Sequence, residues 1–220
     1  NTQQLCAGLA MGKRLLTVGD GDLSFSLALS RAFNVHIIAT TWLSAEELLE
    51  RYKSAAETRD ELLQRGVVVL HEVDACHLEK LKEMSPVDVA IFNFPHLGDV
   101  GADCHRPESE HVQRHVMLLS HFLHSARCIT GEVHISLCGE QASLWNLQEC
   151  AQHLGWEECR RYAPADVEEF TSGALAGLSP APTEATWRCR RKWRNGSLGF
   201  VHWASGYGYE HRRHEGEQVM

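Results

Sequence analysis

Short apolar runs alternate with amphipathic stretches along the chain as far as Gly155. A run of about four to eight apolar residues that ends at a glycine or a polar loop is typical of a buried strand, whereas apolar residues that recur every three or four positions are typical of a helix. On this basis strands are predicted at 14–18, 35–41, 67–73, 88–92 and 132–137. Helices are predicted at 23–32, 44–65, 77–84, 108–127 and 142–154.

The ends of several predicted helices carry recognisable signals. Ser44 and Glu47 are spaced as in a capping box, and Gly66 and Gly155 are placed to end helices. Strict alternation of strand and helix predicts right-handed βαβ units and a doubly wound, mostly parallel sheet. The predicted fold class is therefore α/β of the Rossmann-like kind, in which ligands bind at the carboxyl ends of the strands near the topological switch point.

Length and composition are those of one ordinary soluble globular domain. Of the 220 residues, 44% are hydrophobic and 23% are charged, and no apolar run approaches the ~20 residues that a membrane helix needs. Residues 1–12 are expected to be an N-terminal extension without the basic start of a signal peptide, and 13–220 a single domain. Proline, glycine and small residues around 163–185 predict a flexible insertion within it.

The eight cysteines are spread along the chain, and no CxxC pair occurs among them. This spacing argues against a zinc ribbon and against a compact disulfide framework. Reduced thiols in an intracellular compartment are therefore favoured over a secreted, disulfide-bonded protein.

A glycine-rich loop joins the first predicted strand to its helix. Its residues are Gly19, Asp20, Gly21, Asp22, Leu23, Ser24 and Phe25. Glycines allow a tight turn and a close approach of the backbone to a ligand, and in dinucleotide enzymes the start of the following helix binds a pyrophosphate. Here the two aspartates would repel phosphate, so a cationic, phosphate-free cofactor such as S-adenosylmethionine (SAM) fits the loop better. The alternative is a plain tight turn with an aspartate as helix N-cap.

Of the two positions where acidic residues often bind ribose and adenine, only the second carries an acidic residue in this chain. In many such enzymes an acidic residue at the end of the second strand holds the ribose, but here that position reads Thr40, Thr41 and Trp42. Thr41 is retained as a candidate cofactor contact. Asp74, after the third strand, is placed where an acid often meets the adenine ring, and its alternative role is to cap the next helix.

The loop after the fourth predicted strand begins with Asn93, Phe94, Pro95 and His96. It is similar to the Asn/Asp-Pro-Pro-aromatic loops of enzymes that methylate planar nitrogens. Asn93 is a candidate hydrogen-bonding group for the target base and Phe94 a candidate stacking face. His96 is a candidate proton acceptor, because imidazole titrates near neutral pH. The alternative is a buried turn stiffened by Pro95.

The two loops together resemble a known family. VGDGDLSFSLAL begins at Val18 and FNFPHLG begins at Phe92, about seventy residues later. This pair resembles the 25S rRNA uridine-N3 methyltransferase-like family, which also occurs fused to a ferredoxin-fold anticodon-binding module. The resemblance covers about 13–155.

The resemblance implies a class I methyltransferase domain that uses SAM, an RNA substrate such as rRNA, methyl transfer to N3 of a uridine, and a nucleolar or cytoplasmic location. The cofactor contacts expected in this chain are Gly19, Asp20, Gly21, Asp22, Leu23, Ser24, Thr41, Asp74 and Asn93. The catalytic candidates are Asn93, Phe94, Pro95 and His96, with Asp22 as a second group that could assist proton removal.

A group of histidines lies in or just before one predicted helix: His105, His111, His115, His121 and His124. His111 and His115 are four residues apart and share a helix face, so they could hold a metal ion. No HExxH motif and no cysteine pair accompanies them, so no metal is assigned. A solvated face, lining the substrate groove near Asn93, is favoured.

The formal net charge of −8 does not attract nucleic acid in bulk, so RNA binding must come from a local basic patch. One such patch begins at Trp187 and ends at Arg194, with the sequence WRCRRKWR. It combines Arg and Lys for phosphate with tryptophans for unpaired bases, and it is the expected RNA contact. The alternative is a charged strand or linker whose tryptophans cover the core.

Two other functions remain as alternatives. One is a catalytically inactive module that keeps the fold and recruits RNA or protein partners, and the missing acid after the second strand favours it. The other is a nicotinamide oxidoreductase, which the aspartates in the phosphate-binding position and the same missing acid argue against.

Overall fold

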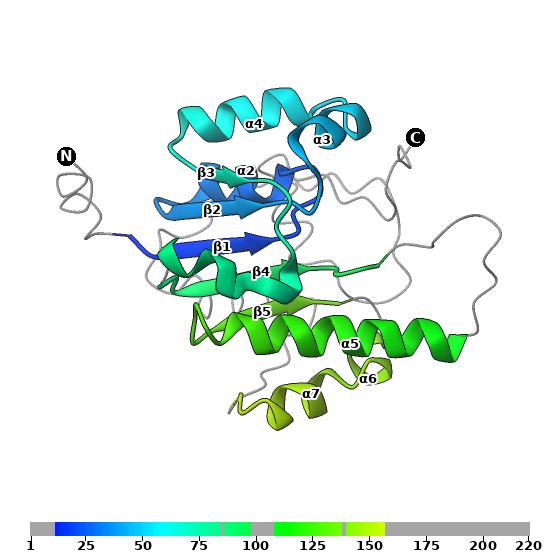
Figure 1. Cartoon of the computed structure of the whole chain (residues 1–220). Coiled ribbons are helices and arrows are strands. Elements are labelled where there is room, and N and C mark those ends of the chain that lie inside the picture. The colour runs from blue at the N-terminus through cyan, green and yellow to red at the C-terminus, as the bar shows by residue number, and fades with distance from the viewer. Residues whose placement is uncertain (1–11, 85, 98–107, 138–139, 157–220) are drawn as a thin grey trace.

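Five parallel strands form a single sheet in the computed structural model, which describes residues 12–84, 86–97, 108–137 and 140–156. The strand order is β3-β2-β1-β4-β5, and all five arrows point the same way in Figure 1. The strands are β1 (Arg14–Val18), β2 (His36–Thr40), β3 (Val68–Leu70), β4 (Val89–Asn93) and β5 (Val133–Ser136).

Helices cover both faces of the sheet (Figure 1). They are α2 (Ser24–Ala32), α3 (Ala45–Arg51), α4 (Ala55–Gln64), the 3₁₀ segment η1 (Ala75–Met84), α5 (Glu108–Ala126), α6 (Gln141–Leu144) and α7 (Leu147–His153). The predicted α/β, doubly wound architecture is confirmed, and the sheet is parallel throughout the described residues.

Side chains of the central strands alternate between two hydrophobic cores, as the period of a strand requires. Leu15 and Ile37 pack in the core that α2, α3 and α4 share. Leu16 and Ile38, one residue further along each strand, pack in the core that η1, α5 and α7 share. Because both faces are buried, these strands read in the sequence as continuous apolar runs rather than as alternating ones.

The single helix predicted at 44–65 is in fact two helices. The capping box is present as predicted, since the Ser44 side chain accepts from the Glu47 N–H while the Glu47 side chain accepts from the Ser44 N–H. The helix then stops at Tyr52, which takes an extended backbone (φ −121°, ψ 113°) and buries its ring. Burial of this large side chain against the glycine-rich loop outweighs the local preference for helix.

The helix predicted at 142–154 is also divided. Trp145 is buried and Asn146 is left-handed (φ 49°), which separates α6 from α7. Two other elements differ from the prediction by more than one residue at an end: β3 is shorter than the predicted strand at 67–73, and η1 begins before His77, which itself lies at a kink. At the break between α6 and α7 the buried Trp145 side chain, and not the local pattern, sets the boundary.

The N-terminal extension up to residue 11, the insertion predicted around 163–185 and the basic patch that begins at Trp187 and ends at Arg194 lie outside the described residues. None of the helices in the described part of the chain combines the length and the apolarity that spanning a bilayer requires.

Candidate active site

The two loops that the sequence singles out lie next to each other at the carboxyl ends of neighbouring strands. Val18, the last residue of β1, is in register with Phe92 near the end of β4, so Gly19 and Asn93 leave the sheet side by side. The chain passes from β1 outward to β2 and β3 on one side, and then returns to form β4 on the other side of β1, which makes this the topological switch point. Open parallel sheets bind their ligands at this point.

Gly19 is required at the start of the first loop for two reasons. Its φ of +61° lies in the left-handed region that favours glycine, and a Cβ here would lie 3.1 Å from the Phe92 ring. Its neighbour Asp20 donates its backbone N–H to the Thr40 carbonyl oxygen at 2.8 Å, which ties the loop to the end of β2. The turn is therefore fixed against two strands.

The two aspartates of the loop fold back onto the first turn of α2. Asp20 Oδ2 accepts from the Ser26 N–H at 2.7 Å and from the Ser26 hydroxyl at 2.5 Å. Asp22 Oδ1 accepts from the Ser24 N–H at 3.0 Å and from the Ser24 hydroxyl at 2.6 Å. These are N–H groups that a dinucleotide enzyme offers to a pyrophosphate. Here the protein's own carboxylates occupy them, so the helix start does not suit a phosphate.

The environment of Asp20 changes its acidity. Loss of hydration on burial, together with the negative charge of Asp22, raises the pKa of Asp20 from 3.8 to about 7, although hydrogen bonds from Ser26 and from the Phe25 backbone oppose the rise. The loop therefore carries a carboxyl group whose charge changes near neutral pH.

The middle of the loop rests on the break between α3 and α4. A Cβ on Gly21 would lie 3.2 Å from the Tyr52 hydroxyl, so the tyrosine ring packs against the backbone of this residue. Leu23 is left-handed (φ 64°) and fully buried at the N-cap of α2. Tyr52 was not identified from the sequence, because its role depends on a tertiary contact.

After β4, Asn93 and Phe94 are both fixed by Ser136 at the end of β5. The Ser136 hydroxyl donates to Asn93 Oδ1 at 2.8 Å, and the Phe94 N–H donates to the Ser136 carbonyl oxygen at 2.8 Å. The side-chain oxygen of Asn93, Oδ1, thus already accepts a hydrogen bond within the protein. The side-chain nitrogen, Nδ2, is the end that can donate to a ligand. Ser136 was missed from the sequence, although its position at the carboxyl end of a predicted strand next to β4 could have identified it.

Phe94 adopts a left-handed backbone (φ 49°), an uncommon conformation for a residue with a bulky side chain. Such strain persists only where the surroundings enforce it, and it is concentrated at functional sites. Pro95 follows and is buried, whereas His96 is exposed at the tip of the turn. The loop thus combines a rigid base with an accessible imidazole.

His115 is not part of a solvated face, contrary to the interpretation of the histidine-rich helix. It is fully buried and stacks on Trp145 at a centroid distance of 4.2 Å with 17° between the planes. Its Nε2 accepts from the Leu97 N–H at 3.3 Å, and its Nδ1 contacts the His111 carbonyl oxygen at 2.8 Å. Burial lowers the pKa of His115. His121 and His124 are exposed as expected, and His105 lies outside the described residues.

Thr41 and Asp74, the candidate contacts for ribose and adenine, both make hydrogen bonds within the protein. Thr41 is 1% exposed, and its hydroxyl accepts from the Leu43 N–H at 3.2 Å, while the neighbouring Trp42 is 63% exposed. Asp74 caps η1, accepting from the Cys76 N–H and pairing with His77 Nδ1, both at 2.8 Å. Burial would raise the pKa of Asp74, but these hydrogen bonds lower it. Of its two predicted roles, capping is therefore present.

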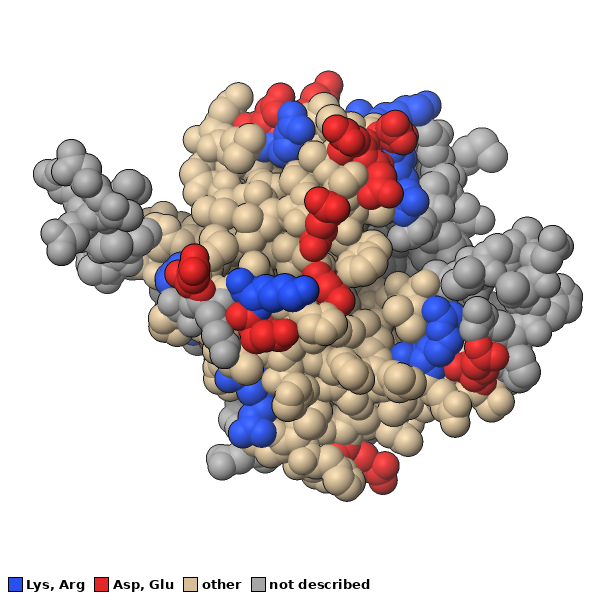
Figure 2. All heavy atoms as spheres, viewed as in Figure 1, with Lys and Arg blue, Asp and Glu red and all other residues tan. Residues whose placement is uncertain are grey.

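Charges of both signs are mixed on the molecular face shown in Figure 2, and its coloured residues form no continuous basic surface. The described residues on that face therefore offer no extended track for a phosphate backbone.

A parallel five-stranded sheet with two such loops at its switch point defines a Rossmann-like methyltransferase fold. The chain belongs to the BMT5-like family, whose model, described as rRNA (uridine-N3-)-methyltransferase BTM5-like, matches residues 16–172. This confirms the resemblance carried by the two loops and, at the level of the family, indicates an rRNA methyltransferase.

Curated proteins from plants and animals are similar to the chain. Heavy metal-associated isoprenylated plant protein 41 of Arabidopsis thaliana is 34% identical over 63% of this chain, and an uncharacterized protein of the same plant, At4g26485, is 33% identical over 56%. Ferredoxin-fold anticodon-binding domain-containing protein 1 of Homo sapiens is 29% identical over 75%. The matched region spans only 28%, 62% and 27% of these relatives' own lengths.

Solved structures with a similar chain path include BdcA in complex with NADPH, which is 10% identical with a TM-score of 0.39. That match covers 72% of this chain and 65% of BdcA. Lactate dehydrogenase from Eimeria maxima matches over 65% of this chain and 41% of its own, with 10% identity and a TM-score of 0.38. Both likenesses are too distant to bear on function.

Proposed function

We propose that the chain is a SAM-dependent methyltransferase that modifies N3 of a uridine in rRNA. The single observation that carries this proposal is the adjacency of the Gly19 loop and the Asn93 loop at the switch point of the sheet. One loop can hold a cofactor and the other an acceptor base, within reach of each other. Family membership supports the same class of reaction.

The chemistry of the first loop fits a sulfonium cofactor better than a dinucleotide. Asp20 and Asp22 occupy N–H groups that would otherwise attract phosphate, and they bring negative charge to the start of α2, Asp20 only as pH rises past its raised pKa of about 7. Gly19 and Gly21 keep the backbone free of side chains at the turn. SAM would supply an electrophilic methyl group here, and the loop of residues 19–24 would hold it, with Asp74 and Asn93 as further proposed contacts.

The second loop would hold the uridine. Uridine N3 carries a proton and lies between two carbonyl oxygens, so the Asn93 amide nitrogen is suited to donate to one of them while Phe94 stacks on the ring. Two hydrogen bonds keep these groups in place: the Ser136 hydroxyl donates to Asn93 Oδ1, and the Phe94 N–H donates to the Ser136 carbonyl oxygen. Pro95 stiffens the backbone that follows. Because positioning supplies much of the acceleration in such transfers, this rigidity is expected to matter more than any single charge.

His96 is the proposed proton acceptor. As the new nitrogen–carbon bond forms and the sulfur–carbon bond breaks, the N3 proton leaves to the imidazole and then to water. Asp22, the other candidate, is buried with Oδ1 bonded to Ser24, so it is better placed to shape the loop than to take a proton. RNA would also contact the basic patch that begins at Trp187 and ends at Arg194.

The direct test is to incubate the purified chain with methyl-labelled SAM and total RNA and to analyse the digested nucleosides. Label is expected in N3-methyluridine. Asn93→Ala should lower the rate about a hundredfold, because the base loses its anchor, and Ser136→Ala should lower it less. His153→Gln, on the exposed end of α7, is the matched control and should be unchanged. Absence of label from every nucleoside would count against the proposal.

A non-catalytic binding module is the second candidate. The residues at the end of β2 favour this function, because the buried Thr41 stands where many methyltransferases have an acidic residue that binds the ribose. Calorimetry separates the two functions: the methyltransferase should bind SAM with measurable heat and be stabilised by it, whereas the module should show neither at millimolar SAM.

A further inference from the structure

Three histidines form a cluster at the end of the sheet where the loop after β4 meets α5. His96 comes from the loop, and His111 and His115 come from successive turns of the helix. One ring nitrogen from each lies within 4.8 Å of the others. The ring centroids are 5.4 Å apart for His96 and His111, 4.8 Å for His96 and His115, and 4.3 Å for His111 and His115.

The hydrogen bonds of His115 determine which of its nitrogens carries a lone pair. A backbone N–H can only donate, so the contact from Leu97 makes Nε2 the acceptor and leaves the proton on Nδ1, which donates to the His111 carbonyl oxygen. Metal-binding histidines typically donate their second ring nitrogen to a carbonyl or carboxylate in this way, which fixes the tautomer and the ring direction. The Leu97 contact, at 3.3 Å, is long enough to be exchanged for a stronger ligand.

The cluster is rigid on one side and open on the other. Trp145 stacks on His115 and holds it fully buried, His111 is partly exposed, and His96 is exposed. Ligand nitrogens around one tetrahedral zinc ion are about 3.4 Å apart, so the rings must turn inward from their present spacing. His96 is the exposed member of the three and lies on a loop, whereas His115 is buried, so His96 is the ring expected to move.

We propose that His96, His111 and His115 form a Zn²⁺ site. All three ligands are imidazoles, which favour zinc and its late transition-metal neighbours over the oxygen-seeking magnesium and calcium ions. A bound ion would join the loop after β4 to the helix that follows it, α5. The argument for the site does not rest on the proposed methyl transfer, although a zinc ion bound through His96 would take the lone pair with which that imidazole would accept a proton.

The test is titration of the metal-free full chain with Zn²⁺ by calorimetry, and with Co²⁺ by visible absorption. The wild type is expected to bind one equivalent more tightly than His111→Ala does, by at least tenfold, and the cobalt spectrum of that equivalent should lack a thiolate charge-transfer band. His96→Ala, an exposed loop change that does not disturb the core, should give the same loss. Circular dichroism of each variant verifies that it is folded.

His121→Ala is the matched control, because His121 lies on the same helix but is exposed and outside the cluster. It should retain the wild-type equivalent. Equal zinc stoichiometry and affinity in the wild type, His111→Ala and His96→Ala would overturn the site, as would an equal loss in His121→Ala. SAM binding and methylation are measured separately, so failure of the zinc site leaves the proposed function untouched.

Discussion

At the scale of single residues, the candidate active site depends on backbone conformations that few residue types accept. Gly19 and Phe94, at the starts of the two loops, are both left-handed, and Gly19 also lies against the Phe92 ring. The sequence pointed to these loops, because a glycine after a buried strand and an Asn-Phe-Pro-His run are visible without coordinates. It did not reveal Ser136, Tyr52 or Trp145, which support the loops from segments far away in the chain.

We predict that Gly19→Ala destabilises the protein by about 2 kcal/mol or more. A left-handed alanine alone costs roughly 1–2 kcal/mol, and the new Cβ would press on Phe92. Gly66→Ala isolates the first term, since Gly66 has a φ of +78° but nothing lies near its Cβ position. Urea unfolding should rank Gly19→Ala as the more damaging of the two, with Gly131→Ala close to neutral; equal values for all three would contradict the close approach of Gly19 to β4.

Asp20 gives the protein a predictable pH dependence. Because the pKa of Asp20 is raised from 3.8 to about 7, the folded state holds a proton that the unfolded state has released, and the free energy of unfolding falls as pH rises through this interval. Asp20→Asn keeps an oxygen for the Ser26 N–H but removes the titration. Its stability relative to wild type, measured by urea unfolding, should therefore rise between about pH 4 and about pH 8; a constant difference would show that Asp20 titrates normally.

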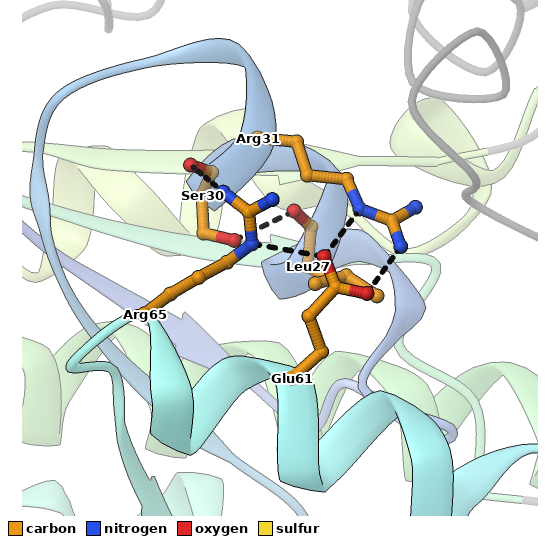
Figure 3. A network of polar contacts seen from close by, with 5 residues as sticks. All are labelled: Leu27, Ser30, Arg31, Glu61 and Arg65. Atoms are coloured by element: carbon orange, nitrogen blue, oxygen red, sulfur yellow. Dashed lines mark hydrogen bonds and ion pairs between the residues drawn. The ribbon is translucent and has the colours of Figure 1, made fainter.

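At the scale of elements, α2 and α4 are joined on their exposed sides by an ion-pair network (Figure 3). Glu61 of α4 receives the Arg31 guanidinium in a two-pronged contact, at 2.9 and 2.5 Å, and Arg65 at 2.9 Å. Arg65 also donates to the Ser30 carbonyl oxygen at 3.4 Å. These contacts, led by that of Arg31, lower the pKa of Glu61 to about 2.

We predict that Glu61→Gln lowers the free energy of unfolding by about 1 kcal/mol at neutral pH, the upper end for an exposed pair, because one carboxylate serves two arginines. Since the pKa of Glu61 is lowered from 4.5, this contribution is present above about pH 4.5 and is lost as pH falls toward 2. Asp60→Asn, whose partner Arg59 is its sequence neighbour, is the control and should have little effect. Urea unfolding in high salt should shrink the Glu61 effect; no difference between the two variants would count against the network.

Element type could be predicted from the sequence far better than element boundaries. All five strands and the alternation of helices follow from apolar runs and glycine stops, because these reflect burial on both faces of a parallel sheet. The breaks at Tyr52 and Trp145 could not be predicted, because in both places a large aromatic residue leaves the helix to fill a space that only the folded chain creates.

At the scale of the whole molecule, β1 is the middle strand of the sheet and contributes side chains to both cores. It lies between β2 and β4, and its successive side chains enter opposite cores, Leu15 on one face and Leu16 on the other. β3 is short, lies at one edge of the described sheet, and exposes 42% of Val68. Stability is therefore expected to be distributed unevenly across the sheet.

Hydrogen exchange measures this distribution. Backbone amides of Leu15 to Thr17 should exchange only on global unfolding, at least about a hundredfold more slowly than those of Val69 and Leu70, which open locally. Mass spectrometry of peptic peptides or NMR of the labelled chain would provide the comparison. Similar protection of β1 and β3 would mean that the sheet opens as one unit.

The stop at Tyr52 has a consequence for how the chain tolerates change. A break between two helices usually tolerates insertions and substitutions. Here, however, the break carries Tyr52, whose phenol packs against the backbone of Gly21. A substitution of Tyr52 that allowed α3 to continue into α4 would favour the local helix but remove the contact of the Tyr52 ring with the Gly21 backbone. A change made to stabilise this part of the chain would therefore loosen the turn that is proposed to hold the cofactor.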